Sequence, residues 1–264
     1  MTSAQTRPAA GATAGAAARP TLVFLHGIGG GAAGFAWHVD HFRGLGWPAL
    51  AWDQPGYGGS APVEPYTLGR VAQALLEQLD RLGVARCIPV GHSMGGMVAQ
   101  ELYALAPARI AGLVLAHTSP AFGSPEGEFQ RRFVEERTRP LDEGLTMDDV
   151  ARRMVPTMLG PGATAQAARA ATELMAAVPP QTYRKAIAAL VSFDRRAQLA
   201  SIAVPTLCLA AQSDRTAAPV VLEKMASKIP GALYRCLAGL GHLAPIEDPP
   251  AFCRAVEEFI GSIE

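Results

Sequence analysis

The chain has 264 residues, of which 49% are hydrophobic and 17% charged, so it can bury the core of one large α/β domain. Lys and Arg together number 23, as do Asp and Glu, and the resulting net charge of zero argues against nucleic acid as a partner. No apolar run approaches the ~18 residues of a membrane span, so we expect no membrane partner.

The N-terminus and the cysteines both bear on where the chain resides. Residues 1–20 are mostly Ala, Gly, Thr, Arg and Pro and lack the Leu, Val or Phe of a signal-peptide core, so we predict a disordered leader. The cysteines show no metal-ligand spacing, and nothing in the sequence requires an oxidising compartment. We therefore predict a cytoplasmic location and buried free thiols at Cys87, Cys208, Cys236 and Cys253.

From residue 21 onward, short apolar runs alternate with longer segments of helical periodicity. The expected strands are residues 21–25, 48–52, 86–90, 110–116, 204–210 and 232–236. The expected helices are residues 34–45, 68–82, 94–106, 218–228 and 250–260. This alternation predicts an α/β fold in which a mostly parallel sheet carries helices on both faces.

Residues 120–195 interrupt the alternation with several helix-like segments and no convincing strand. An insertion of this kind predicts a helical cap over the carboxyl edge of the sheet, where open α/β sheets bind ligands. The expected division is a leader at 1–20, a core at 21–119 and 196–264, and a cap at 120–195. For the cap residues the alternative is packing within the cap itself, but we expect the substrate pocket to include His92, Met154, Met158 and Phe133.

The strongest local signal is GHSMGG, from Gly91 to Gly96, which follows the apolar run CIPV and precedes a helical pattern. A G-x-S-x-G motif at a strand–turn–helix junction holds its serine on a sharp, strained turn. Side chains at Gly91 and Gly95 would clash with the neighbouring strand and helix. The turn also places the following amides at a helix N-terminus, where they stabilise negative charge. We therefore predict that Ser93 is a nucleophile.

A serine nucleophile needs a base and a carboxylate that orients the base. His242 is the best placed of the six histidines, because its glycine-rich loop follows the last expected strand and reaches the same sheet edge as Ser93. Asp214 follows the strand at 204–210 and gives the order Ser, Asp, His along the chain. Glu247 and Asp248 follow the histidine too closely and are expected to cap the last helix.

The segment HGIGGG, from His26 to Gly31, ends the first expected strand in a turn whose backbone can approach a ligand closely. We expect the amides of Ile28 and Met94 to stabilise the oxyanion that forms when the serine attacks a carbonyl. The alternative, a phosphate-binding loop, is disfavoured because the G-x-G-x-x-G register and a following Lys-Ser or Lys-Thr are missing. We expect neither a metal nor an organic cofactor.

The segments HGIGG, DQPGYGGS, GHSMGG, SDRTAAP and GHLAPIEDP occur in an order that resembles the α/β-hydrolase superfamily over residues 21–260. Within the superfamily, IAVPTLCLAAQSD and GHLAPIEDPPAF are most similar to 3-oxoadipate enol-lactonase-like and carboxylesterase members. The resemblance implies a structural role for Asp53 in the turn DQPGYGGS. Because enol-lactonase substrates carry carboxylates, it also implies a pocket cation, with candidates Arg132, Arg139, Arg152 and Arg153.

These residues and the resemblance predict a serine hydrolase that cleaves a carboxylic ester or lactone through an acyl-enzyme intermediate. The expected partner is a small-molecule ester or lactone, and the oligomeric state is open. Two alternatives remain at this point. One is cofactor-free perhydrolase or lyase chemistry on the same triad, and the other is a small-ligand receptor without catalytic activity.

Overall fold

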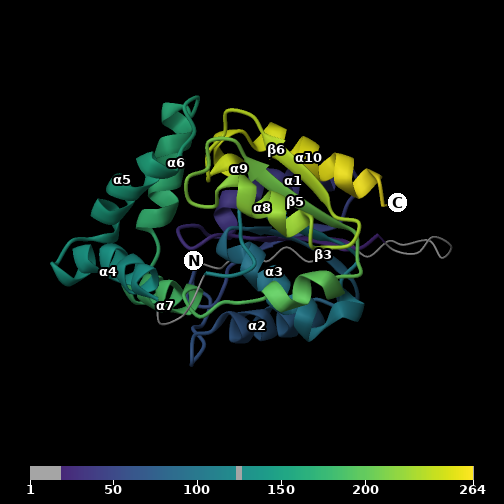
Figure 1. Cartoon of the computed structure of the whole chain (residues 1–264), viewed down its shortest axis with the longest axis horizontal. Coiled ribbons are helices and arrows are strands. Elements are labelled where there is room, and N and C mark those ends of the chain that lie inside the picture. The colour runs from purple at the N-terminus through teal and green to yellow at the C-terminus, as the bar shows by residue number, and fades with distance from the viewer. Residues whose placement is uncertain (1–18, 123–126, 264) are drawn as a thin grey trace.

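The computed structural model describes residues 19–122 and 127–263 and is built around a parallel sheet of six strands (Figure 1). The strand order is β2-β1-β3-β4-β5-β6, and every neighbouring pair runs parallel. The strands are β1 (Thr21–Leu25), β2 (Ala49–Trp52), β3 (Cys87–His92), β4 (Leu113–Ala116), β5 (Thr206–Ala211) and β6 (Leu233–Leu237). The predicted α/β fold is thus confirmed. The predicted leader lies, up to residue 18, outside the described residues.

Helices cover both faces of the sheet, which explains why its central strands are apolar on both sides. Leu22 and Phe24 of β1 belong to the core on one face, and Val23 and Leu25 belong to the core on the other. The first face is covered by α1 (Ala36–Gly44) and α10 (Pro249–Gly261), and the second by α2 (Leu68–Arg81), α3 (Met94–Leu105) and α8 (Pro219–Ala226). Short helical turns link these elements: η1 (Ala32–Phe35), η2 (Pro107–Arg109), η3 (Arg196–Ser201) and α9 (Ala244–Glu247).

Helix α2 shows why these segments fold as they do. Its buried residues Val71, Leu75 and Leu79 recur every four positions, so they form one apolar stripe on the sheet. The helix begins where the Thr67 side chain accepts a hydrogen bond from the Arg70 amide, which satisfies one of the unpaired amides of the first turn.

Four helices lie between β4 and β5 in the sequence and project beyond one end of the sheet, at the left of Figure 1. They are α4 (Glu128–Asp142), α5 (Met147–Met158), α6 (Ala165–Ala176) and α7 (Pro180–Leu190). The chain enters and leaves this region side by side, because the Arg195 amide donates to the Pro120 carbonyl over 2.7 Å and the Phe122 amide to the Phe193 carbonyl over 3.0 Å. These helices occupy the place at which the sequence predicts a cap, and α4 to α7 are termed the cap helices, or the cap.

The cysteines differ from the expectation at one position. Cys87, Cys208 and Cys253 are buried free thiols, but Cys236 is exposed. Its strand β6 lies at the edge of the sheet, and three of its five residues are exposed, so an apolar β-type run there does not imply burial. In the ranges that the structure describes, no helix is both long and apolar enough to cross a membrane.

Candidate active site

The residues predicted for catalysis meet at the carboxyl edge of the sheet. Ser93 directly follows β3, Asp214 follows β5, and His242 lies in the loop between β6 and α9. Since all the strands are parallel, each of these loops emerges at the same edge. The structure therefore brings together three side chains that are up to 149 positions apart in the sequence.

The turn at Ser93 is strained, and the glycines around it are required by the packing. Ser93 has a φ of +54°, which residues with a side chain rarely adopt. A Cβ on Gly91 would lie 2.6 Å from the Gly95 carbonyl carbon, and a Cβ on Gly95 would lie 2.6 Å from the Leu25 carbonyl carbon. The Thr118 hydroxyl donates to the Ser93 carbonyl over 2.8 Å and helps to hold the turn.

A chain of hydrogen bonds joins the three side chains. The Ser93 hydroxyl lies 3.0 Å from Nε2 of His242, and Nδ1 of His242 lies 2.8 Å from Oδ2 of Asp214. The other carboxylate oxygen of Asp214 accepts from the amides of Thr216 and Ala217, each over 2.8 Å. This geometry gives Nδ1 the proton and leaves Nε2 free to accept the proton of the serine.

The electrostatics of the site keep Asp214 ionised although it is buried. Burial by itself raises the pKa of this carboxyl, but interactions with His117 and His242 and with the backbone amide of Ala217 outweigh burial and hold the pKa well below its usual value. A charged Asp214 accepts a hydrogen bond from the Nδ1–H of His242 at neutral pH. The same charge stabilises the imidazolium that forms when His242 takes up a second proton.

His92 lines the cavity as predicted, and it also holds the loop of His242. Its Nε2 donates to the His242 carbonyl over 2.7 Å, and the His242 amide donates to the Met158 carbonyl of the cap over 2.7 Å. Burial lowers the pKa of His92 well below its usual value, so the ring is neutral. The backbone of His242 is therefore held from the core and from the cap.

The position of His117 in the site was not predicted from the sequence. This residue follows β4, is fully buried, and has a φ of +50°. Its Nδ1 lies 3.7 Å from Oδ2 of Asp214, on the carboxylate oxygen that also contacts His242. Burial lowers the pKa of His117, so the neutral ring packs against the carboxylate without replacing His242 as its closest partner. Its location after a central strand was the signal that could have identified it.

Glu247 does not cap the last helix as predicted. Its carboxylate accepts from the Gly160 amide over 2.8 Å and from the Gly241 amide over 3.1 Å, so it joins the end of the cap helix α5 to the loop of His242. A Cβ on Gly160 would lie 2.7 Å from the Gly241 nitrogen, which shows how closely the two backbones pack. Asp248 does cap α10, because it accepts from the Ala251 amide over 2.9 Å.

The glycine-rich turn after β1 lies beside Ser93. A Cβ on Gly27 would come within 3.1 Å of the Ser93 Cβ, and Ile28 lines the cavity. Tyr57 from the turn DQPGYGGS donates its hydroxyl to the Ile28 carbonyl over 3.1 Å, which orients the peptide that follows. Met94 is buried and begins α3, so its amide belongs to the first turn, where amides lack partners within the helix.

His26 and Asp53 support this turn. Nδ1 of His26 donates to the Gly27 carbonyl over 2.8 Å, while its Nε2 accepts from the Gln54 amide over 3.1 Å. Burial lowers the pKa of His26 to about 4, which keeps the ring in the neutral form that these two bonds need. Asp53 accepts from the Ala32 amide over 2.7 Å, as the structural role implied by the resemblance requires.

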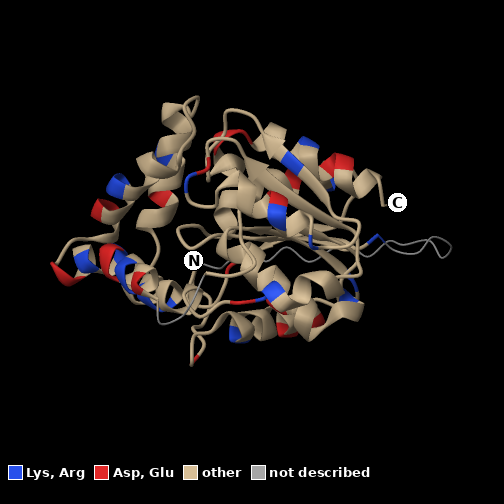
Figure 2. Cartoon of the chain, viewed as in Figure 1, with Lys and Arg blue, Asp and Glu red and all other residues tan. Residues whose placement is uncertain are grey.

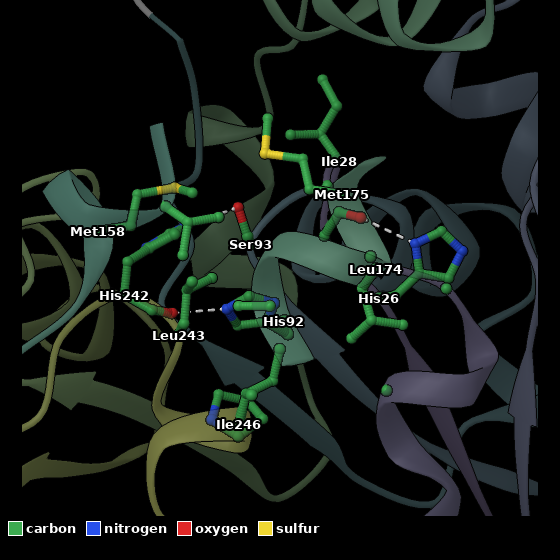
Figure 3. A pocket seen from close by; sticks show the side chains of 18 of the residues that line it. His26, Ile28, His92, Ser93, Met158, Leu174, Met175, His242, Leu243 and Ile246 are labelled. Atoms are coloured by element: carbon green, nitrogen blue, oxygen red, sulfur yellow. Dashed lines mark hydrogen bonds between the residues drawn. The ribbon is translucent and has the colours of Figure 1, made fainter. Parts of the chain in front are cut away.

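A cavity of about 60 Å³ lies over Ser93. Cap helix α5 contributes Met154 and Met158, and α6 contributes Leu174 and Met175. Figure 3 shows Ser93 between Met158 and His242 on one side and Met175 and Ile28 on the other. The cavity is small compared with ligand pockets of ~300–1,000 Å³. A small apolar group attached to a reacting carbonyl would therefore be enclosed by the cap.

Phe133 is not among the residues that line this cavity, which corrects the prediction. Its ring packs against Phe122 with centroids 4.4 Å apart, and the Arg137 guanidinium lies over it at 3.6 Å. Phe133 lies on α4, whereas the cap side chains at the cavity come from α5 and α6. Helical periodicity identified an apolar position but did not show which neighbour it meets.

The four arginines considered as pocket cations do not line the cavity either. Arg132, Arg139 and Arg152 pair with acidic residues four positions away in the sequence, at distances of 3.7, 3.9 and 2.7 Å, and all are exposed. Arg153 is exposed as well. Figure 2 shows residues of both charges spread along the cap helices. Among the residues that the structure describes, no cluster of His, Cys, Asp and Glu could hold a metal ion.

Comparison with known proteins identifies the family of the chain. A family model described as the alpha/beta hydrolase family matches residues 22–255, so the chain belongs to the alpha/beta hydrolase family. It is 31% identical over 252 residues to a protein of Pseudomonas syringae pv. syringae with the name "Putative carbamate hydrolase RutD", covering 92% of this chain and 94% of that protein.

Two solved structures extend the comparison. A hydrolase from Pseudomonas aeruginosa is 31% identical, with a TM-score of 0.81 over 94% of this chain and 92% of that one. An enol-lactonase from Burkholderia xenovorans is 26% identical, with a TM-score of 0.79 over 93% and 92%. These matches confirm the superfamily resemblance and the fold.

Proposed function

We propose that this chain is a serine hydrolase that cleaves a carboxylic ester or lactone of a small molecule. The observation that carries the proposal is the hydrogen-bonded series from Ser93 through His242 to Asp214, with distances of 3.0 and 2.8 Å. An activated serine beside an apolar cavity suits attack on a carbonyl carbon whose acyl group is apolar. The names of the relatives, which include a hydrolase and an enol-lactonase, agree with acyl transfer to water.

In the first step His242 removes the proton of the Ser93 hydroxyl through Nε2 as the serine oxygen attacks the carbonyl carbon. The amides of Ile28 and Met94 hold the oxyanion, and a lost donor of this type typically costs ~3–4 kcal/mol of transition-state stabilisation. The imidazolium then gives its proton to the leaving oxygen. In the second step His242 activates a water molecule, which releases the acyl group and restores Ser93.

The test is release of p-nitrophenol from p-nitrophenyl acetate and butyrate by the wild type and by Ser93→Ala. We expect the variant to lose up to about a millionfold in kcat, because the nucleophile is missing while the fold is kept. Ser227→Ala is the matched control, since Ser227 is exposed at the end of α8. It should retain wild-type turnover. Equal turnover by Ser93→Ala and wild type would refute the mechanism.

A second measurement separates a narrow enzyme from a receptor without activity. An organophosphorus fluoride should phosphorylate Ser93: the serine oxygen bonds to phosphorus, fluoride leaves, and His242 takes the proton. Mass spectrometry would show one added phosphoryl group in the wild type and none in Ser93→Ala. A folded wild type that resists labelling and releases no product, yet binds a small ligand saturably, would favour the receptor. Serine-dependent halogenation or cyanohydrin cleavage without ester hydrolysis would favour the perhydrolase or lyase alternative.

A further inference from the structure

The cavity over Ser93 has walls without formal charge. Among the described residues that line it, none is Asp, Glu, Lys or Arg. The cap turns apolar helix faces towards it, with Met154 and Met158 one turn apart on α5 and Ala171 and Leu174 nearly one turn apart on α6. The charged residues Arg152 and Arg153 of α5 lie on its exposed side. The interior of the site is thus separated from the cap's charges.

His26 and His92, which line the cavity, do not supply a positive charge for a bound anion. His26 uses Nδ1 and Nε2 for the Gly27 carbonyl and the Gln54 amide, and burial lowers its pKa to about 4. His92 uses Nε2 for the His242 carbonyl, and burial also lowers its pKa. His242 is hydrogen-bonded through Nδ1 to the carboxylate of Asp214, so an anion bound beside this ring would also meet the negative charge of Asp214.

A substrate carboxylate in this cavity would lose its water and find no cation. An unpaired buried charge is strongly disfavoured, whereas an apolar group of the same shape gains from leaving water. We infer that the site selects uncharged, apolar acyl groups and rejects acyl groups that carry a carboxylate. This inference rests on the proposed ester hydrolysis. It separates the chain from the carboxylate-bearing substrates that the enol-lactonase resemblance implied.

Leu174 is the position from which this selection can be changed. It lines the cavity from α6 and packs on η1, because a Cβ on Gly34 would lie 3.1 Å from its Cδ1. Unlike Met175, which is 1% exposed, Leu174 is only half-buried. A longer side chain at this position can therefore extend along the cavity wall without entering the packed core.

The experiment compares two activated esters whose acyl groups have the same shape, p-nitrophenyl 4-methylpentanoate and mono-p-nitrophenyl succinate. The first ends in two methyl groups, and the second ends in the two oxygens of a carboxylate. Ser93→Ala supplies the blank for spontaneous hydrolysis. We expect kcat/KM to favour the apolar ester by about 100-fold or more, because the carboxylate is desolvated without a partner. Leu174→Lys should reduce this ratio at least about tenfold, whereas the uncharged variant Leu174→Met, of similar length, should keep it.

The outcomes are distinct. Equal or faster Ser93-dependent hydrolysis of the succinate ester overturns the inference and leaves the proposed function intact. Hydrolysis of p-nitrophenyl acetate with neither matched ester accepted also overturns it, because the cavity would then refuse an apolar acyl group of this size. If no ester, acetate included, gives Ser93-dependent release, the proposed function fails and the inference fails with it.

Discussion

Replacing Gly95 by Ala tests the most constrained contact of the site. The new Cβ would lie 2.6 Å from the Leu25 carbonyl carbon and closer still to its oxygen, where ordinary contacts begin at 3.4 Å. Both obstacles are backbone atoms of β1, so α3 must move away from the strand by about 1 Å. Overpacking of this kind costs ~1–3 kcal/mol, and we expect the upper half of that range because no flexible side chain can yield.

The same movement shifts Ser93, which precedes α3, relative to His242. A misplacement of ~1 Å costs about 100-fold in rate, so kcat should fall by about that factor for p-nitrophenyl acetate. Urea titration gives the free energy of unfolding. Gly261→Ala in α10 is the matched control: its Cβ meets nothing within 4 Å, so it should gain up to ~1 kcal/mol from helix propensity. Unchanged stability and turnover in Gly95→Ala would refute the packing argument.

Three further predictions concern stability and the catalytic loop. His26 and His38 each have a pKa lowered by burial to about 4, against 6.5 when unfolded. Only the unfolded chain therefore takes up protons at these two histidines as the pH falls from 6.5 towards 4. Urea titrations should show that the free energy of unfolding falls by up to ~3 kcal/mol for each histidine, and a free energy that does not change over this pH range would contradict the prediction. Phe252→Ala should lose ~3–5 kcal/mol because the ring is fully buried, whereas Phe129→Ala, at a residue 66% exposed, should lose under ~1 kcal/mol. Glu247→Ala should lower kcat and the free energy of unfolding, because the loop of His242 loses its hydrogen bonds to this carboxylate. Glu258→Ala, which removes an exposed ion pair, is the control. Equal kcat values for the two variants would show that the loop does not need the Glu247 carboxylate.

Local sequence patterns were sufficient to predict the strands of the sheet and the residues that meet at its carboxyl edge. The strands of a covered parallel sheet are apolar throughout, so they stand out in the sequence, and parallel strands place their following loops at one edge. The glycines around Ser93 reflect contacts with atoms nearby in the chain or in the adjoining strand. The candidate triad was therefore predictable as a set of loops, before any distance between its side chains was known.

The cap shows what the sequence by itself leaves open. Met154, Met158 and Phe133 are all apolar positions on amphipathic helices, yet the first two face the cavity and Phe133 packs against Phe122. The periodicity of a helix defines its apolar face, but the element that this face meets depends on how the helices pack.

Contacts between loops that are distant in the sequence also depend on how the elements pack. Glu247 joins α5 to the loop of His242, and His117 reaches Asp214 across the sheet edge, and neither contact has a local sequence pattern. The sequence by itself determined the fold class and the chemical groups at the sheet edge, since these follow from local periodicity and chain order. Only the tertiary structure decided which charges are kept out of the cavity and which side chains hold His242, because those depend on packing between segments far apart in the chain.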